Sequence, residues 1–184
     1  MVFQSAHYIE KSKHTALMNK RFIIAFIAIV SLASCKFPYS FTGADIPVEA
    51  KTFSVKYFQN NASLVQPILS QKLTEKLRDK MLQQTSLSII NSAGDVAFEG
   101  EITNYTLQPV AIQGNETAQL TQLTVTINVR FFNKFYPEKN YESNFTRYQQ
   151  FASSQSLTSI EDQLLEQIVE ELVDDIFNKA LVNW

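Results

Sequence analysis

The chain has 184 residues and a formal net charge of −2, with two histidines, one cysteine and four glycines. Because His7, His14 and Cys35 all lie within its first 35 residues, the rest of the chain cannot build a His/Cys zinc site, a Ser-His-Asp triad or a disulfide. It also lacks the Lys/Arg cluster of a nucleic-acid-binding protein.

The N-terminal region is typical of an exported lipoprotein. Residues 18–35 read MNKRFIIAFIAIVSLASC, with a basic start, an apolar run and small residues before Cys35. The apolar run is too short for a membrane span, which needs roughly 20 residues. We therefore predict an upstream extension at 1–17, a signal peptide at 18–34 and a lipidated, extended tether at 35–51. Cleavage before Cys35 would leave 150 residues (184 − 34), with 12 basic (16 − 4) and 17 acidic (18 − 1) side chains.

The covalent lipid on Cys35 is the only bound group that the sequence predicts, and we expect no metal and no other cofactor. Acyl chains contribute about 0.8 kcal/mol for each buried methylene, so this anchor would hold the protein on a membrane permanently. The residue after the cysteine is Lys36 rather than Asp, which favours the periplasmic face of the outer membrane over inner-membrane retention.

The first elements of the domain are a strand and an amphipathic helix. Residues 52–58 alternate apolar and polar side chains, as in a half-buried strand. Residues 63–84 place Val65, Leu69, Leu73, Leu77 and Met81 at four-residue intervals, which predicts a helix with Pro67 in its first turn.

A series of strands follows this helix. We predict a short strand at 87–90, a longer one from Val96 to Leu107 with a bulge near Asn104, and the clearest alternation at 122–131. The last strand is expected at 140–151, after a turn at 133–139.

Residues 156–184 predict a second long helix with a wide apolar stripe. Thr158 and Glu161 have the spacing of a capping box at its start. The other face of the helix carries seven acidic residues, which we interpret as a solvated surface. They are Glu161, Asp162, Glu166, Glu170, Glu171, Asp174 and Asp175.

Both helices need an apolar surface to cover, and the sheet is the only candidate. We therefore predict a single α+β domain over residues 52–184, a two-layer sandwich with a mostly antiparallel four- to five-stranded sheet and both amphipathic helices packed on one face. The other face of the sheet would present Thr, Gln, Asn and Arg to water or to a partner.

Three segments, together with the lipobox, resemble the LptE family of lipopolysaccharide-assembly lipoproteins. They are FPYSFTGA at 37–44, QPVAIQGNETA at 108–118, and the C-terminal run from Glu161-Asp162 to DIFNKALVNW at 175–184. The resemblance implies an outer-membrane lipoprotein that plugs the β-barrel LptD. The pair would move lipopolysaccharide to the cell surface. It also implies that lipopolysaccharide is bound through basic residues, although no family motif for that binding matches here residue by residue.

Four basic residues are the candidate contacts for lipopolysaccharide phosphates. Arg130, Lys134, Lys139 and Arg147 lie on the last two long strands and the turn between them, so a hairpin would bring them into one neighbourhood. The alternative is that they are scattered surface charges that discourage pairing at the sheet edge.

The connection at 108–117 is the candidate contact with the barrel, because long hairpin loops often carry function. Its residues of interest are Pro109, Ile112, Gln113, Gly114 and Asn115. The alternative is that the loop folds back on its own sheet.

We predict that the protein is not an enzyme. Glu99 and Glu101 share a strand face and superficially suit glycoside hydrolysis, but the domain has no second acidic constellation, no histidine and few glycines to shape a pocket. The alternative to a barrel plug is a free periplasmic lipoprotein that binds or chaperones a lipid or an envelope precursor.

Overall fold

The computed structural model describes residues 46–110 and 119–182. The predicted signal peptide, Cys35 and most of the tether lie outside this range. The elements are β1 (Thr52–Val55), β2 (Gln59–Asn60), α2 (Pro67–Gln84), β3 (Ser88–Ile89), β4 (Val96–Val110), β5 (Leu120–Asn133), the 3-10 turn η1 (Pro137–Lys139), β6 (Tyr141–Ala152) and α3 (Leu157–Leu181).

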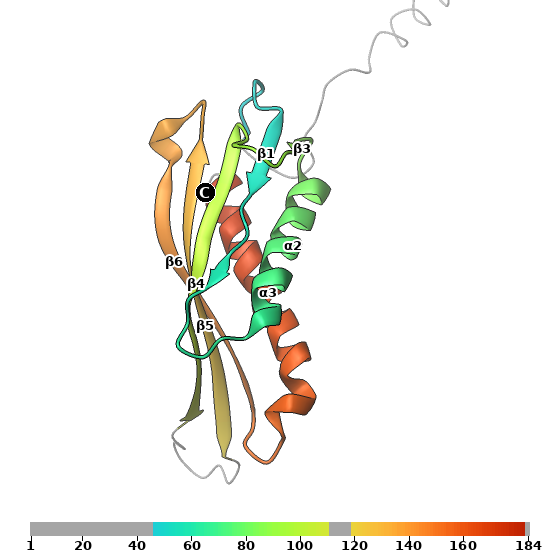
Figure 1. Cartoon of the computed structure of the whole chain (residues 1–184), viewed down its shortest axis with the longest axis vertical. Coiled ribbons are helices and arrows are strands. Elements are labelled where there is room, and N and C mark those ends of the chain that lie inside the picture. Colours follow the sequence, from blue (N-terminus) through green and yellow to red (C-terminus); the bar gives the residue numbers. More distant parts are fainter. Residues whose placement is uncertain (1–45, 111–118, 183–184) are drawn as a thin grey trace, which may run out of the picture. The chain divides into compact units, whose positions relative to one another are not determined.

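The strands form one six-stranded sheet in the order β3-β1-β4-β5-β6, with β2 also paired to β4 (Figure 1). The three long strands β4, β5 and β6 are antiparallel, as predicted. The short strands β1, β2 and β3 pair in parallel, so the sheet is mixed and has more strands than expected. Parallel neighbours need a crossover connection, and α2 provides it between β1 and β4. The predicted bulge lies between Ile102 and Asn104.

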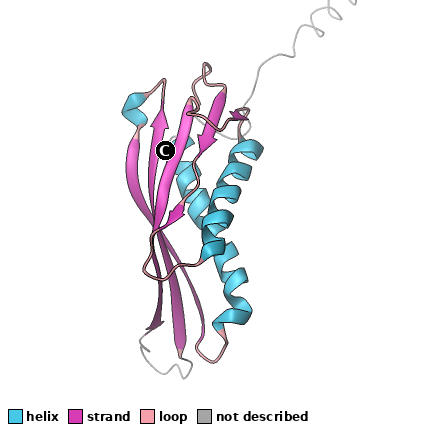
Figure 2. Cartoon of the chain, viewed as in Figure 1, coloured by secondary structure: helices cyan, strands magenta, loops and turns pink. Residues whose placement is uncertain are grey.

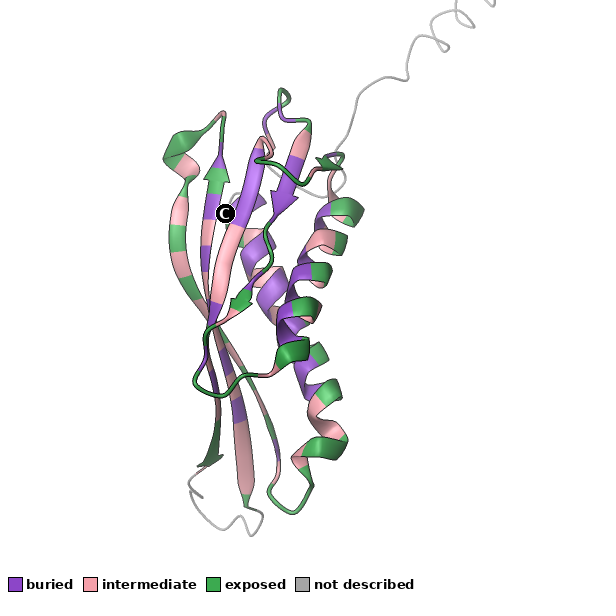
Figure 3. Cartoon of the chain, viewed as in Figure 1, coloured by how far each residue is buried: buried purple, intermediate pink, exposed green. Residues whose placement is uncertain are grey.

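Both helices cover the same face of the sheet, which confirms the predicted α+β sandwich (Figure 2). Their apolar stripes meet the apolar side chains of β4 and β5 in one core (Figure 3). Leu123, Val125, Ile127, Val129 and Phe131 of β5 are all fully buried toward the helices. The alternating residues of the same strand lie on the opposite face, as the period of a strand requires.

The predicted strand at 52–58 is divided at Phe58, whose side chain is fully buried in the core. The backbone N–H of Phe58 donates to Thr74 Oγ1 of α2 (3.2 Å) instead of continuing the sheet. The ring of Phe58 lies against Gly100 of β4, at a position where a Cβ atom would come within 2.6 Å of it. The chain therefore leaves β1 to bury an aromatic ring and returns to the sheet as β2.

The ends of the two helices differ from the predictions for reasons local to each. The first helix begins at Pro67 rather than at residue 63, because the residue before a proline is held in extended conformation, as Gln66 is. The predicted capping box is wrong, since Ser156 is the N-cap of α3 and makes no side-chain cap. The carboxylate of Glu161 instead accepts hydrogen bonds from Tyr105 and from Gln66 (2.8 Å).

From the sequence we predicted that the acidic face of α3 is a solvated surface. The structure corrects this prediction, because part of the face is paired with α2. Three lysines of α2, spaced four residues apart, face it. Lys72 pairs with Asp162 (3.0 Å) and Glu166 (3.5 Å), Lys76 with Glu166 (2.7 Å) and Lys80 with Asp174 (2.8 Å). These pairs raise the pKa of Lys72 and Lys76 and lower that of Glu166, chiefly through side-chain hydrogen bonds. Being partly solvated, they fix the alignment of the helices more than they stabilise the fold.

Asp95 ties the start of β1 to the chain that leads into β4. Its Oδ2 atom accepts hydrogen bonds from the backbone N–H groups of Lys51 (3.1 Å) and Thr52 (3.2 Å) and from Thr52 Oγ1 (2.9 Å). These bonds, led by the one from Lys51, lower the pKa of Asp95 below its ordinary value of 3.8. The carboxylate is thus needed in its ionised form to hold this end of the sheet.

Replacing Gly100 with alanine should destabilise the fold. A Cβ atom there would lie 2.2 Å from the backbone oxygen of Asn128 and 2.6 Å from the ring of Phe58. We expect a loss of about 1–3 kcal/mol or more in the free energy of unfolding, measured by urea denaturation. Gln108→Ala, at an exposed position of the same strand, is the control. An equal, small effect of both changes would contradict this packing.

Replacing Asp95 with asparagine should reduce stability at neutral pH and flatten its pH dependence. A carboxylate whose folded pKa is depressed contributes stability above its unfolded pKa, and loses it as pH falls through the folded value. Unfolding free energies measured from pH 7 down to about 2 should therefore fall less below about pH 4 in Asp95→Asn than in the wild type. Asp79→Asn, at an exposed position of α2, is the control for the removal of one carboxylate. Parallel profiles for Asp95→Asn and the wild type would refute the role of Asp95.

Candidate functional site: the open face of the sheet

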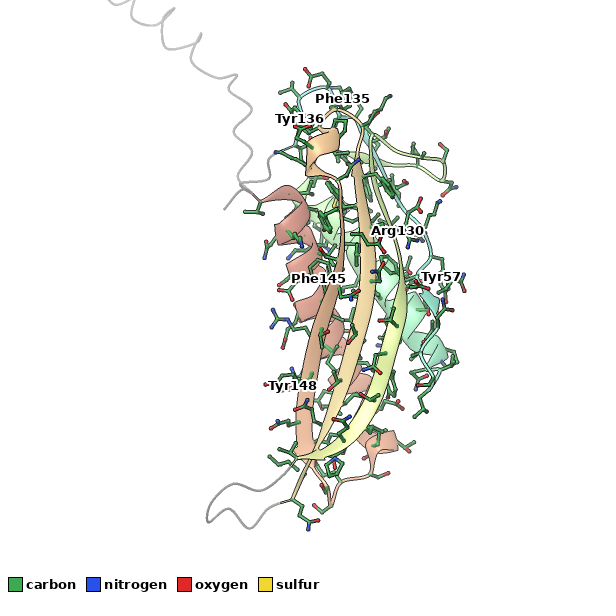
Figure 4. The ribbon with its side chains drawn as sticks, turned by 90° about the vertical axis from the view of Figure 1, so that its left-hand side faces the viewer. Tyr57, Arg130, Phe135, Tyr136, Phe145 and Tyr148 are labelled. Atoms are coloured by element: carbon green, nitrogen blue, oxygen red, sulfur yellow. The ribbon has the colours of Figure 1, made fainter. Side chains whose placement is uncertain are left out.

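On the face of the sheet away from the helices (Figure 4), uncharged polar side chains of β5 and β6 pair with each other across the two strands. Thr126 and Thr146 share a hydrogen bond (3.0 Å) between β5 and β6, and Asn128 donates to Asn144 (3.0 Å). Further along the same strands, Gln150 donates to Gln122 (3.1 Å). Because these groups bond to each other across the strands, their side chains are held in fixed register before any partner binds. We call this set of six residues the polar ladder.

One exposed aromatic side chain stands on β6 beside the polar ladder. Tyr148 is 53% exposed and lies opposite Thr124 in the strand register. Aromatic residues with a polar tip are frequent anchors in protein interfaces. The open face therefore combines hydrogen-bonding groups with exposed aromatic rings, since Phe132 of β5 is also 42% exposed.

Charged residues occupy the end of the face near β1. Glu99 pairs with Lys56 (2.5 Å), and Glu101 accepts a hydrogen bond from Asn61. Arg130 of β5 stands in register between Glu99 of β4 and Glu142 of β6. Glu99 and Glu101 share the open face, as the strand period predicts, but each is held by a neighbour from the β1–β2 segment.

The structure separates the four predicted basic residues into two groups. Arg130 lies on the open face, and Lys134 and Lys139 lie at the β5–β6 turn, where their ammonium groups approach the rings of Phe135 (5.6 Å) and Tyr136 (5.1 Å). Lys134 also lies 3.4 Å from Asp95. Phe135 and Tyr136 are labelled in Figure 4.

Arg147 lies apart from the other three, on the helix side of the sheet. It makes two hydrogen bonds to Asp175 of α3 (2.6 and 2.7 Å), which raise its pKa, and Glu171 is 3.8 Å away. The hairpin brings Arg147 opposite Val125, a buried position, because its place in the strand alternation is the reverse of that of Arg130. Arg147 therefore joins the edge strand β6 to α3.

The predicted connection at 108–117 begins later than expected, because β4 continues to Val110. Gln108, Pro109 and Val110 stay in register with β5. Proline is tolerated there because, among the described residues, β4 has no neighbour on its other side beyond Ile102. Pro109 is exposed, whereas Ile112, Gln113, Gly114 and Asn115 lie outside the described residues.

Two features with chemical consequences were missed from the sequence. The lysines of α2 were detectable from their four-residue spacing opposite the acidic run of α3. Arg78 of the same helix carries no such signal, and it reaches back to the carbonyl oxygen of Val55 (2.9 Å). Within residues 46–110 and 119–182, no group of His, Cys, Asp and Glu side chains could hold a metal ion. The helices of this part are also too short or too polar to cross a membrane.

Solved structures of similar proteins include several bacterial lipoproteins. A minor lipoprotein from Acinetobacter baumannii is 12% identical, with a TM-score of 0.45 over 72% of this chain and 97% of that one. Uncharacterized lipoprotein B from Nitrosomonas europaea is 14% identical, with a TM-score of 0.45 over 78% and 88%. A hypothetical protein from Chlamydia trachomatis is 10% identical, with a TM-score of 0.48 over 71% and 98%.

The family is decided by the sequence match rather than by these distant structures. No curated protein matches the chain. The lipopolysaccharide-assembly family LptE matches residues 50–180, which include the whole sheet and both helices described above except Leu181, the last residue of α3. The predicted resemblance is thereby confirmed, and the chain belongs to the LptE family of lipopolysaccharide-assembly proteins.

Proposed function

We propose that this protein is a lipid-anchored component of an outer-membrane lipopolysaccharide translocon, in which its domain plugs an LptD-like β-barrel. The anchor would be the lipid on Cys35, at the periplasmic face of the outer membrane. The protein would have a structural and binding role and catalyse no reaction. Family membership supports the part in lipopolysaccharide assembly. The observation that carries the plug role is the polar ladder on the open face of the sheet.

The polar ladder suits the inside of a barrel for a physical reason. The lumen of an outer-membrane barrel is lined by polar, water-facing side chains, so an apolar partner surface would be mismatched there. Thr, Asn and Gln can exchange hydrogen bonds with such a wall without the desolvation cost of burying charge. An open sheet face can also simply be solvated, so the interaction has to be tested directly.

Extraction of the native membrane in mild detergent should recover the protein together with a large β-barrel. Introducing charge into the polar ladder and next to it, with Thr146→Glu and Thr124→Glu together, should reduce this co-purification about tenfold or more, because unpaired buried charge weakens an interface strongly. Thr146 is exposed and Thr124 is half-buried on the open face, so neither change places charge in the core and the unfolding temperature should change little.

The matched control carries the same charges on the helix layer, as Gln163→Glu with Gln167→Glu. These residues are exposed on α3, away from the sheet. Recovery of wild-type protein without any barrel would contradict the plug and favour the alternative, a free periplasmic lipoprotein that binds a lipid or an envelope precursor.

Lipopolysaccharide binding should depend on three of the four predicted basic residues. Lys or Arg side chains supply charge-assisted hydrogen bonds to phosphate, and Arg130, Lys134 and Lys139 lie on the open face and at the turn that continues it. Replacing all three with alanine should weaken binding of purified lipopolysaccharide about tenfold or more, with unchanged urea denaturation.

Arg147→Ala is the internal control, since this side chain is bonded to Asp175 on the helix side. It should leave lipopolysaccharide affinity unchanged. Unaltered binding by the triple variant, or a loss of binding in Arg147→Ala equal to that of the triple variant, would refute this assignment.

A further inference from the structure

A cavity of about 450 Å³ opens where β3 separates from β1, at the edge of the sheet farthest from β6. The last paired residue of β3 is Ile89, opposite Phe53, and Ile90 donates to the carbonyl oxygen of Phe53 (2.9 Å). Beyond this point the chain crosses β1 on its way to β4, with the N–H of Gly94 donating to Ser54 Oγ (3.2 Å), so Val55 has no strand neighbour on this side within the described residues. The cavity is lined by Ser54–Tyr57, Arg78, Ile89–Ala93, Ala97 and Glu99. Its volume lies within the range of about 300–1,000 Å³ that is typical of ligand sites.

Arg78 enters this cavity from α2 and is only partly bonded. One Nη atom donates to the carbonyl oxygen of Val55 (2.9 Å), whereas the buried Nε atom has no acceptor among the described residues. Arg78 also forms no ion pair with an acidic side chain of residues 46–110 or 119–182. Lys72, Lys76 and Lys80 on the same helix are each paired with α3. Among the basic residues of α2, Arg78 is thus the one that has no carboxylate partner within the described residues.

The charges around the cavity match a ligand with a single negative charge. The lining holds two cations, Arg78 and Lys56, and one anion, Glu99. Since Lys56 and Glu99 pair with each other (2.5 Å), one positive charge remains, that of Arg78. A carboxylate would balance this charge, whereas a doubly charged phosphate would carry an excess next to Glu99. Guanidinium groups bind carboxylates with two parallel hydrogen bonds, so the chemistry fits as well as the charge.

The rest of the lining fits a peptide better than a simple organic acid. Tyr57 and Ile89 remain 49% and 41% exposed, so they offer apolar surface for a side chain (Figure 4 labels Tyr57). Asn91 and Ser92 add polar groups to the lining. The carbonyl oxygen of Val55 on this edge of β1 already accepts from Arg78, so an extended chain laid beside the edge would hydrogen-bond to the remaining N–H groups and to Arg78 itself.

We propose that this cavity binds the free C-terminal carboxylate of an extended peptide, with Arg78 as the residue that holds the carboxylate. The site is distinct from the polar ladder and from the three basic residues assigned to lipopolysaccharide. It requires neither a barrel nor lipopolysaccharide, so its test is independent of the proposed function.

The test uses the mature lipoprotein in detergent and follows the binding of four probes by NMR titration. The probes are N-acetyl-Val-Phe with a free carboxylate, the same peptide with a C-terminal amide, inorganic phosphate, and hexanoate, a carboxylate without peptide groups. The free acid should bind at least about tenfold more tightly than the amide, because a charge-assisted bond to Arg78 is lost in the amide. The largest shifts should fall on the amides of residues 89–93.

Variants separate binding by Arg78 from a general effect of charge. Arg78→Gln should abolish the preference for the free acid, and Arg78→Lys should retain part of it. Lys76→Gln, two residues away on the side of α2 that faces α3, should retain all of it. If Arg78→Gln does not fold, the comparison of acid with amide on the wild type and on Arg78→Lys decides. The proposal would be overturned if the free acid and the amide bound equally well. It would also be overturned if phosphate or hexanoate, which has no peptide groups, bound as tightly as the free acid.

Discussion

The structure depends on the burial of two apolar helix stripes against one face of one sheet. Ten residues of α3 and six of α2 are buried, and the long strands β4 and β5 supply most of the surface that receives them. Since strand residues alternate between faces, the burial of one set of side chains in the core determines which side chains lie on the other face. The open face is therefore continuous, polar and free of helix cover along β5 and β6. Everything proposed about a large partner follows from this division.

Polar contacts align the two layers without adding much to the core. The lysines of α2 meet the acids of α3, and Arg147 joins β6 to α3 through Asp175. Lys179 of α3 likewise reaches Ser143 of β6 (2.5 Å). These contacts join charged residues of the two helices to each other and join β6 to α3 on the helix side. The neutral polar pairs lie on the opposite side, along β5 and β6.

Periodicity predicted the parts of the fold in which one physical rule acts alone. The alternation of Leu123 to Phe131 and the stripe of α3 both follow from burial on one face, and the bulge near Asn104 is visible as a change of phase. The sequence pattern could not show that β1 and β2 would be separate, because Phe58 leaves the sheet to pack against Gly100, a contact between distant segments. Nor could local spacing show that Glu161 would bind Tyr105 rather than cap its own helix.

The candidate sites were predicted less completely than the fold, because a site depends on which faces and ends the topology brings together. Arg130 and Arg147 lie on neighbouring strands, but their places in the alternation put them on opposite sides of the sheet. Arg78 gains its importance from the point where β3 leaves β1, which depends on the crossover through α2. Such placements follow from strand order and register, and single-sequence patterns contain neither.

The most direct test of the central claim is photo-crosslinking in living cells from the middle of the open face. A photoreactive residue at Thr126 should capture a β-barrel protein, and mass spectrometry should place the crosslinked peptide on a strand residue that faces the barrel lumen. The same photoreactive residue introduced at Gln167, an exposed position of α3, is the control that compares capture from the helix layer with capture from the open face. Capture of no barrel from Thr126, or of lipid-facing barrel positions alone, would contradict the account.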